Sequence, residues 1–579
     1  MIAKTSLRRC AARAAFPLYI TAATVFLALQ MFQGLSFLDI GMYLAGCQWF
    51  NEDPWSCYYL GQWFLSYKLT GALLHACGDS SFMALRVMAL ALNIVTQTAI
   101  YLYTSRLVPR RYAIAGLAMA TLACFGGYTD INYNDWSVAL LTAALLCYHA
   151  GLFRRRGLWL IAAAGGLVGV AVFFRVVNLT FLVMPLVAAA VSRRCGSAVG
   201  AGRQLAAFAL GAAAGCAAVI GAAVADGSAP VLLQTALDLT AIGGSADDPH
   251  SLKNVAISAY TVWKGYVAGF APVALIALLM ALAARAHGPW RRLPLMALLS
   301  GLAALNVYFW EPSANITAGT AIAALALAVG AGRRWGRAEC LLVLSLMVPL
   351  VFPLGSNGGP QFFGQYVGFL PLPVALWAVA RGLPATAGWH GPQWRTALGC
   401  AFAAVCAGLL LANARRPLME DGTRAECRHT VCSPATRHIM TTGANARMYA
   451  YLQREAGARV PRGSYMMCNF SLPLISVLEC RPYAVFSDVF TSERMNRAYI
   501  DTAYRRAGGG GRLPWLLLDR STLTDGFADA CRHLRQYAPY RLVWTDGRYE
   551  LWKPLTGGRE KRPVGKPCCG GLSEIGTRR

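Results

Sequence analysis

The chain has 579 residues, of which 56% are hydrophobic and only 14% are charged. A soluble globular domain carries about 25% charged residues, so the composition excludes an ordinary soluble protein. Apolar runs of about 17 to 25 residues recur along most of the chain, and this length spans a bilayer as a helix. The runs are continuous and do not alternate, which excludes a transmembrane β-barrel.

The net charge of +26 is distributed in a way that argues against nucleic-acid binding. The basic residues occur in small groups between apolar runs, as the positive-inside rule requires, and a further part lies in the C-terminal tail. The 18 cysteines show no metal-site spacing such as a paired CxxC motif. Several of them lie inside apolar runs, where cysteine acts as a small packing residue.

The apolar pattern predicts an α-helical polytopic membrane protein with about 13 transmembrane helices. The first span follows Lys4, Arg8, Arg9 and Arg13 and is too long for a signal-peptide core, so we expect a retained signal anchor. The expected spans are 16–35, 83–104, 112–128, 136–152, 158–174, 176–192, 204–225, 262–284, 293–310, 315–331, 340–355, 366–382 and 396–413.

Charged residues separate between the two sides of these spans. The connections on the side of the basic N-terminus carry Arg106, Arg110, Arg111, Arg154, Arg155, Arg156, Arg193, Arg194, Arg203, Arg285, Arg291, Arg292, Arg333, Arg334, Arg337, Arg381 and Arg395. The opposite connections carry Asp39, Glu52, Asp53, Asp79, Asp130, Asp135, Asp226, Asp247, Asp248 and Glu311. The first set predicts a cytoplasmic N-terminus, and an odd number of spans then puts the C-terminal region outside. Short loops rich in Arg, Ala and Gly favour a bacterial inner membrane, with the C-terminal region in the periplasm.

This organisation divides the chain into three predicted parts. Residues 1–413 form a predicted transmembrane catalytic domain with long outer connections at 36–82 and 226–261. The first connection is rich in Trp and Tyr, which predicts one or two amphipathic helices lying along the membrane surface. Residues 414–555 form a small extracytoplasmic α/β domain, and the basic tail 556–579 is expected to be disordered.

Short helical and extended patterns alternate in the predicted α/β domain. The helices are MYAYLQREAG, SLPLISVLE, ERMNRAYIDTAYRRA and FADACRHLRQY, and the strands are SYMMCNF, YAVFSD and WLLLD, followed by a hairpin in YRLVWTDGRYELWK. Its cysteines are Cys427, Cys432, Cys468, Cys480 and Cys531. They could form disulfides on an oxidising face, in a pairing that the sequence does not give.

Asp39 is the first acid of the chain and lies in the stretch SFLDIGMY, just after the first span. An acid followed by aromatic-rich sequence is a poor lipid anchor, so one interpretation places it at the mouth of a cavity. The alternative is a helix-end acid in a solvated loop. The next outer connection, YTDINYNDW, contains Asp130 and Asp135. These could line the same cavity and bind a divalent cation, Mg²⁺ or Mn²⁺, or orient an acceptor; alternatively they cap the following helix.

Arg175 interrupts the run GGLVGVAVFFRVVNLTFLVMPLVAAA near the outer face. An Arg at membrane level is costly and needs a partner, and its planar fork suits phosphate. The alternative is a side chain that snorkels to lipid headgroups. Gly165, Gly166 and Gly169 precede it and allow close helix contact. In the second long outer connection, His250 and Lys253 could contact a phosphate, although a lone loop His is more often solvated.

This arrangement resembles the C-type (GT-C) superfamily of integral-membrane glycosyltransferases, which includes protein O-mannosyltransferases and the aminoarabinose transferase of lipid A. The resemblance rests on Asp39 after the first span, a helix-rich first connection, and a second acid in the next outer connection. The run GGLVGVAVFFRVVNLTFLVMPL also resembles the family's signature GLLAGLAFLTR-x-x-x-LLLLPL. The family often has two adjacent acids in the first connection, whereas Asp39 is followed by Ile40 and Gly41.

The resemblance implies a sugar donor on polyprenyl phosphate and a lipid, glycan or protein acceptor at the outer face. Asp39 would be the general base of an inverting transfer. Arg175 would stabilise the leaving phosphate, with His250 and Lys253 as further candidates, and a metal, if present, would bind Asp39 and Asp130.

Three other functions stay open. A flippase or transporter of lipid-linked saccharides should show repeat symmetry and mid-membrane charges, and neither is clear. A polysaccharide polymerase or ligase should carry several Arg in its outer connections, where Arg is scarce. A purely structural protein would gain nothing from keeping the costly Arg175 within the helix bundle.

Overall fold

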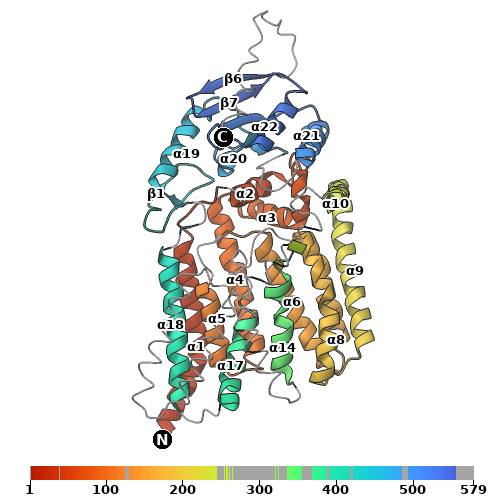
Figure 1. The fold of residues 1–579 in the computed structure, drawn as a ribbon, viewed down its shortest axis with the longest axis vertical. Coiled ribbons are helices and arrows are strands. Elements are labelled where there is room, and N and C mark those ends of the chain that lie inside the picture. The colour runs from red at the N-terminus through yellow and green to blue at the C-terminus, as the bar shows by residue number, and fades with distance from the viewer. Residues whose placement is uncertain are drawn as a thin grey trace, which may run out of the picture.

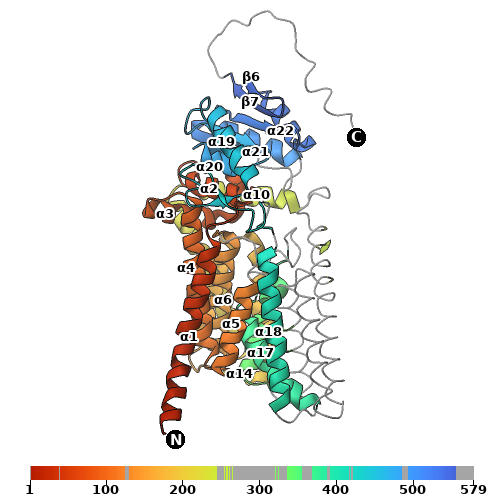
Figure 2. The same ribbon diagram turned by 90° about the vertical axis from the view of Figure 1, so that its left-hand side faces the viewer.

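The computed structural model describes residues 2–37, 39–123, 130–243, 335–354, 368–387, 392–415, 417–418, 421–484 and 493–555, with a few single positions between 253 and 324. These residues form a long helical bundle with an α/β region, residues 421–555, at one end (Figures 1 and 2). We call this end of the bundle the upper end. The N-terminus lies at the opposite, lower end.

The described part of the bundle contains long helices that run between its two ends and shorter helices between them. They are α1 (Ile2–Gln30), α4 (Phe82–Thr104), α5 (Arg110–Ala123), α6 (Tyr133–Leu152), α7 (Leu158–Phe174), η2 (Val176–Val183), α8 (Met184–Cys195), α9 (Ala201–Ala225), α14 (Arg337–Ser345), α15 (Met347–Val351), α17 (Pro371–Ala387) and α18 (Pro392–Arg415). Among the described residues, the segments Phe82–Thr104, Tyr133–Leu152, Val176–Cys195 and Ala201–Ala225 are long and apolar enough to cross a membrane. The expected span 293–310, and almost all of the spans 262–284 and 315–331, lie outside the described residues.

Glycines bring α7 and α9 into close contact, as the glycine-rich sequence predicts. A Cβ atom on Gly165 would lie 2.0 Å from the carbonyl oxygen of Phe208, and one on Gly211 would lie 1.9 Å from that of Ala162. The two backbones therefore touch without intervening side chains. Small residues at such positions are the usual means of packing helices in membranes.

The first outer connection folds into α2 (Asp39–Trp49), η1 (Tyr58–Trp63) and α3 (Phe64–Cys77) between the bundle and the α/β region (Figure 2). The expected helices are present, and their position along a membrane surface stays a prediction. The aromatic side chains of Tyr43, Phe50, Tyr58 and Tyr67 are fully buried in a protein core. Helix α10 (Ala229–Gly243) packs on this layer, where the Thr235 hydroxyl donates to the carbonyl oxygen of Tyr58 at 3.3 Å.

The α/β region contains a five-stranded mixed sheet in the order β4-β3-β5-β7-β6. Its elements are β1 (His429–Thr430), β2 (Met440–Thr441), α19 (Gly443–Glu455), β3 (Tyr465–Cys468), α20 (Pro473–Val477), β4 (Arg481–Pro482), α21 (Glu493–Arg506), η4 (Ala507–Gly509), β5 (Trp515–Asp519), α22 (Asp525–Leu534), β6 (Tyr540–Thr545) and β7 (Tyr549–Pro554). Strands β4, β3 and β5 are parallel, and β7 is antiparallel to β5 and β6.

The predicted helices and strands between residues 448 and 555 are confirmed with one exception, and the short strands β1 and β2 were not predicted. The strand expected in YAVFSD is wrong at its start, because β4 ends at Pro482 and Tyr483 and Ala484 lie outside it. The remainder of that stretch lies outside the described residues. The five cysteines of the region are free thiols, so the disulfides that the sequence allowed are not formed in this structure.

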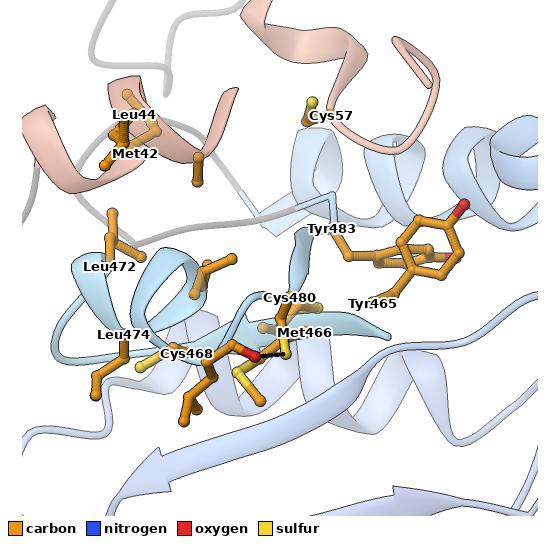
Figure 3. Close-up of a cluster of buried hydrophobic side chains, with 14 of the residues drawn as sticks. Met42, Leu44, Cys57, Tyr465, Met466, Cys468, Leu472, Leu474, Cys480 and Tyr483 are labelled. Carbon is orange, nitrogen blue, oxygen red and sulfur yellow. Dashed lines mark hydrogen bonds between the residues drawn. The ribbon is translucent and has the colours of Figure 1, made fainter. Parts of the chain in front are cut away.

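The first connection and the α/β region share one hydrophobic core. Met42, Leu44 and Cys57 from the first connection belong to the same buried cluster as Leu474 and Met466 from the α/β region (Figure 3). The backbones also approach closely across it. A Cβ atom on Gly41 of α2 would lie only 2.2 Å from Pro473 Cδ and 2.5 Å from its backbone nitrogen.

Replacing Gly41 by Ala is therefore expected to destabilise the protein, although Ala normally favours a helix over Gly. The added methyl group would push α2 away from α20, and such overpacking costs about 1–3 kcal/mol. The apparent melting temperature of the purified protein in detergent should fall. Gly202→Ala in α9 is the control, because nothing lies within 4 Å of its Cβ position; equal melting temperatures for the two variants would contradict the close packing.

Candidate functional site

The segment 31–37 joins α1 to α2 at the upper end of the bundle, and its carbonyl groups point at one arginine. Arg86 Nη1 donates to the carbonyl oxygens of Met31 and, at 3.2 Å, of Gln33. Arg86 Nη2 donates to the carbonyl oxygen of Gly34 at 2.6 Å. The guanidinium therefore gathers three backbone carbonyls just before the chain enters α2.

Arg86 also forms a buried ion pair with Asp130. Its Nε lies 2.9 Å from Asp130 Oδ1, and the two side chains are 2% and 4% exposed. Burial raises the pKa of the Asp130 carboxyl, and the adjacent charge of Arg86 opposes this shift. The backbone N–H of Ile131 donates to the carbonyl oxygen of Leu85 at 3.2 Å. Arg86 thus connects the segment 31–37, helix α4 and the connection that leads into α6.

The α/β region holds the same segment from its other side. The N–H of Gly34 donates to the carbonyl oxygen of Met440 at 2.9 Å, and the N–H of Met440 donates to that of Phe32 at 2.7 Å. Gln33 pairs with Met440 as an isolated parallel bridge. This part of the segment is therefore paired like a short strand with β2.

Two further contacts lead up to α2. The N–H of Leu35 donates to Asp421 Oδ2 at 2.9 Å, and the N–H of Leu472 donates to the carbonyl oxygen of Phe37 at 2.8 Å. Asp39 follows as the first residue of α2. Its side chain is not among those that the structure describes. The structure therefore shows how the backbone before Asp39 is fixed, and the role of its carboxylate stays a prediction.

Asp135 lies in the first turn of α6 and forms a capping box. Its Oδ2 accepts from the N–H of Asn132 at 2.9 Å, while Asn132 Oδ1 accepts from the N–H of Asn134 at 2.7 Å. The capping alternative for Asp135 is thus confirmed. The ligand-binding roles of Asp135 and Asp130 stay predictions, and each carboxylate has a protein partner.

The first turn of α6 also contacts the layer formed by the first connection. Trp136 Nε1 donates to the Thr70 hydroxyl at 3.0 Å, and the hydroxyls of Thr70 and Tyr43 are hydrogen-bonded at 2.9 Å. The Trp63 and Tyr133 rings stack with centroids 4.8 Å apart. The carboxylates of the second outer connection therefore lie directly beneath α2 and α3.

Arg175 lies between α7 and η2, close to this turn. The ring of the preceding residue, Phe174, lies 5.7 Å from that of Trp136. Arg175 is only 4% exposed, and its Nη1 donates to the carbonyl oxygen of Phe352 at 2.9 Å. Its guanidinium also lies 4.7 Å from the Phe352 ring centroid. The snorkelling alternative is wrong, because the side chain is buried among helices and does not extend to a surface.

The remaining candidates are not brought to this place by the described residues. His250 lies outside them, as do Asp247 and Asp248. Lys253 is described only as an exposed residue in helical conformation.

The described residues contain no group of three or more His, Cys, Asp or Glu side chains arranged to hold a metal ion. Asp130 was one of two predicted ligands for a divalent cation. Its Oδ1 already accepts from Arg86, which supplies a positive charge at that oxygen. Asp130 therefore shares its negative charge with Arg86, and its role as a metal ligand stays a prediction.

The sequence analysis missed Arg86, although the signal was present. Arg86 interrupts the apolar run FMALRVMALALN in the same way that Arg175 interrupts its own run. An Arg near the end of a span that is otherwise apolar should have been assigned a buried partner.

Comparison with protein-family models and with curated proteins finds no match. Two solved structures of the oligosaccharyltransferase of Archaeoglobus fulgidus are similar in fold, each with a TM-score of 0.46 and 12% sequence identity. One is a complex with zinc and sulfate, and the similarity covers 92% of this chain and 72% of that chain. In the other, an acceptor peptide containing the NVT sequon is tethered by a disulfide bond, and the coverage is 93% and 74%.

Asp130→Asn should destabilise the protein strongly, because it leaves the Arg86 charge buried without a counter-ion. Breaking a buried pair in this way costs about 3–5 kcal/mol. The matched control is Asp226→Asn, which removes the partner of Lys68 from a pair whose Asp226 side chain is 46% exposed. An exposed pair contributes about 1 kcal/mol or less. The measurement is the yield of monodisperse protein and its apparent melting temperature, and similar losses for both variants would contradict the assigned burial.

Proposed function

We propose that this protein is a membrane glycosyltransferase that transfers a sugar from a polyprenyl-phosphate donor to an acceptor on the periplasmic face, with inversion at the anomeric carbon. One observation carries the proposal. At the upper end of the bundle, the backbone that leads to Asp39 is fixed by Arg86 and Asp421, and the buried Arg175 lies beside the first turn of α6. A candidate base and a candidate phosphate ligand are thus carried by the same end of an apolar bundle.

Asp39 is the general base in this proposal. Its carboxylate takes the proton of the acceptor nucleophile, which attacks the anomeric carbon as the bond to the donor phosphate oxygen breaks. A positioned base of this kind contributes about 10² to 10⁴ in rate. Asp130 and Asp135 are the candidates for orienting the acceptor, because Arg86 and the N–H of Asn132 each occupy only one oxygen of these carboxylates. The proposal gives the base role to Asp39 alone.

Arg175 stabilises the leaving lipid phosphate, whose negative charge grows as the glycosidic bond breaks. Its planar guanidinium can bind phosphate oxygens in a bidentate manner. His250 and Lys253 are further candidates for contacts to the same phosphate. A lipid donor also gives a reason for building the site on an apolar bundle, because the lipid chain can stay in the bilayer.

The basic connections at the lower end support the proposed orientation. Arg106 and Arg154 follow the lower ends of α4 and α6, and Arg110 and Arg203 lie in the first turns of α5 and α9 at the same end. Lys and Arg concentrate on the cytoplasmic side of membrane proteins. The α/β region and the upper end of the bundle then lie outside the cytoplasm, in the periplasm if the host is bacterial.

Asp39→Asn is expected to lower the rate of sugar transfer by about 10²- to 10⁴-fold while the protein stays folded, because the amide has the same shape but cannot accept the proton. The test uses protein purified in detergent, radiolabelled polyprenyl-phosphate sugars and membrane extracts as the acceptor source. Asp79→Asn is the control: this acid belongs to the same connection, and its Oδ1 accepts from the N–H of Ser81 at 3.0 Å.

A variant Asp39→Asn with full activity would contradict the assigned base. If the wild-type protein leaves the label on its donor but moves the lipid-linked sugar between the leaflets of a liposome, the protein is a flippase and the proposed transfer is wrong.

Arg175→Gln should lower kcat by about 10²-fold, as loss of one stabilising donor to a developing negative charge does. Arg175→Lys keeps the charge but loses the planar fork, so an intermediate kcat is expected. Arg194→Gln is the control at the lower end, where its guanidinium lies 5.1 Å from the Trp335 ring. The assay is initial-rate kinetics with varied donor, and an unchanged kcat in folded Arg175→Gln would remove Arg175 from the mechanism.

A further inference from the structure

The contacts of Arg86 all lie on one short stretch of backbone and one carboxylate. Three of its nitrogens donate to the carbonyls of Met31, Gln33 and Gly34 and to Asp130, and the side chain is 2% exposed. A planar guanidinium can serve several acceptors in fixed directions at once, whereas an ammonium group is a single point of charge. The site therefore requires Arg and not merely a cation.

The stretch that Arg86 binds contains a sharp backbone turn at Gly34, and the contacts around this turn explain it. Gly34 has φ of +82°, a left-handed conformation that favours glycine. A Cβ atom there would lie 2.7 Å from Leu418 Cβ. The chain thus turns sharply at Gly34, between Arg86 on one side and the α/β region on the other, and it reaches Asp39 five residues later.

A buried ion pair contributes little to stability compared with apolar residues of similar volume. A role in stability alone therefore gives no particular reason to bury Arg86 and Asp130 at this point. A role in geometry does, since displacing a reacting group by about 1 Å can cost 10²-fold in rate.

From these contacts we propose that Arg86 is a positioning residue for the transfer reaction. It bridges the carbonyls of Met31, Gln33 and Gly34 to the Asp130 carboxylate and so fixes where α2 starts and where Asp39 is presented. Asp421, which accepts from the N–H of Leu35, completes this fixation from the α/β region. The inference rests on the proposed function, because it acts through Asp39.

The first test is kinetic and compares Arg86→Lys in two backgrounds. In the Asp39 background we expect kcat to fall at least tenfold while the donor KM stays within twofold, because the base is misplaced and the donor site is not. In the Asp39→Asn background, Arg86→Lys should change the residual rate by less than twofold, because there is no base left to misplace. An additive loss in both backgrounds would overturn the positioning role in favour of a general structural one.

The matched control is Arg481→Lys. Arg481 also joins the first connection to the α/β region, through Glu52 at 3.3 Å and the Trp49 ring at 4.3 Å, but it does not contact residues 31–37. Its kcat should stay within twofold of the wild type. A loss equal to that of Arg86→Lys would show that any weakening of this junction slows the enzyme, and would overturn the specific role of Arg86.

The second test measures the protection of the backbone amides from exchange and does not depend on enzymatic turnover. Hydrogen–deuterium exchange of the peptide covering residues 31–37 should be faster in Arg86→Lys than in the wild type, with no change in peptides from β5 and β7. Unchanged exchange in residues 31–37 would overturn the inference. If Arg86→Lys does not fold, Asp421→Asn is measured in the same two designs, since it weakens the same fixation from the other side.

The outcomes separate the two proposals. Full activity of Asp39→Asn contradicts the proposed base, and the positioning role with it. Loss of activity in Asp39→Asn together with an unchanged kcat in Arg86→Lys contradicts the positioning role alone.

Discussion

The buried pair of Arg86 and Asp130 is the interaction on which the upper end of the molecule depends. One guanidinium neutralises a carboxylate and satisfies three backbone carbonyls that would otherwise be buried without donors. Unsatisfied carbonyls are costly in a low-dielectric environment, so these hydrogen bonds restrict the backbone conformation of the segment between α1 and α2. Helix α4 and the connection that leads into α6 are held by the same ion pair. The pair therefore fixes the positions of the segment 31–37, α4 and the start of α6 relative to one another along the bundle.

The α/β region is part of this site and does not merely accompany it. Its β2 pairs with the segment after α1, its Asp421 binds the N–H of Leu35, and its apolar residues complete the core of the first connection. The Tyr465 hydroxyl donates to Asp53 in the same junction. A site that forms at the boundary of two layers is therefore supported from both, and neither layer alone would fix the start of α2.

Much of the fold followed from periodicity and length. Helix α7 begins and ends at the predicted residues 158 and 174, and β5 is the predicted WLLLD, because both have strong local patterns. The first connection is helical as predicted, but the burial of its aromatic side chains was not, since an aromatic-rich stretch suits a membrane surface and a protein core equally well. The same limit applies to the site. The sequence singled out Asp39, Asp130, Asp135 and Arg175 by type and position, but Asp130 and its partner Arg86 lie 44 residues apart, and no local pattern joins them.

The shared core also constrains how the chain can be assembled. Asp53 and Tyr465 lie 412 residues apart, and Gln48 and Ser476 lie 428 apart, yet each pair is hydrogen-bonded across the same junction. During synthesis, α2 and α3 are complete long before the strands that cover them exist. Contacts of such large sequence separation form slowly, and apolar surface that waits for its partner is prone to aggregate. The first connection must therefore be shielded, by the membrane surface or by another protein, until the last quarter of the chain has been made.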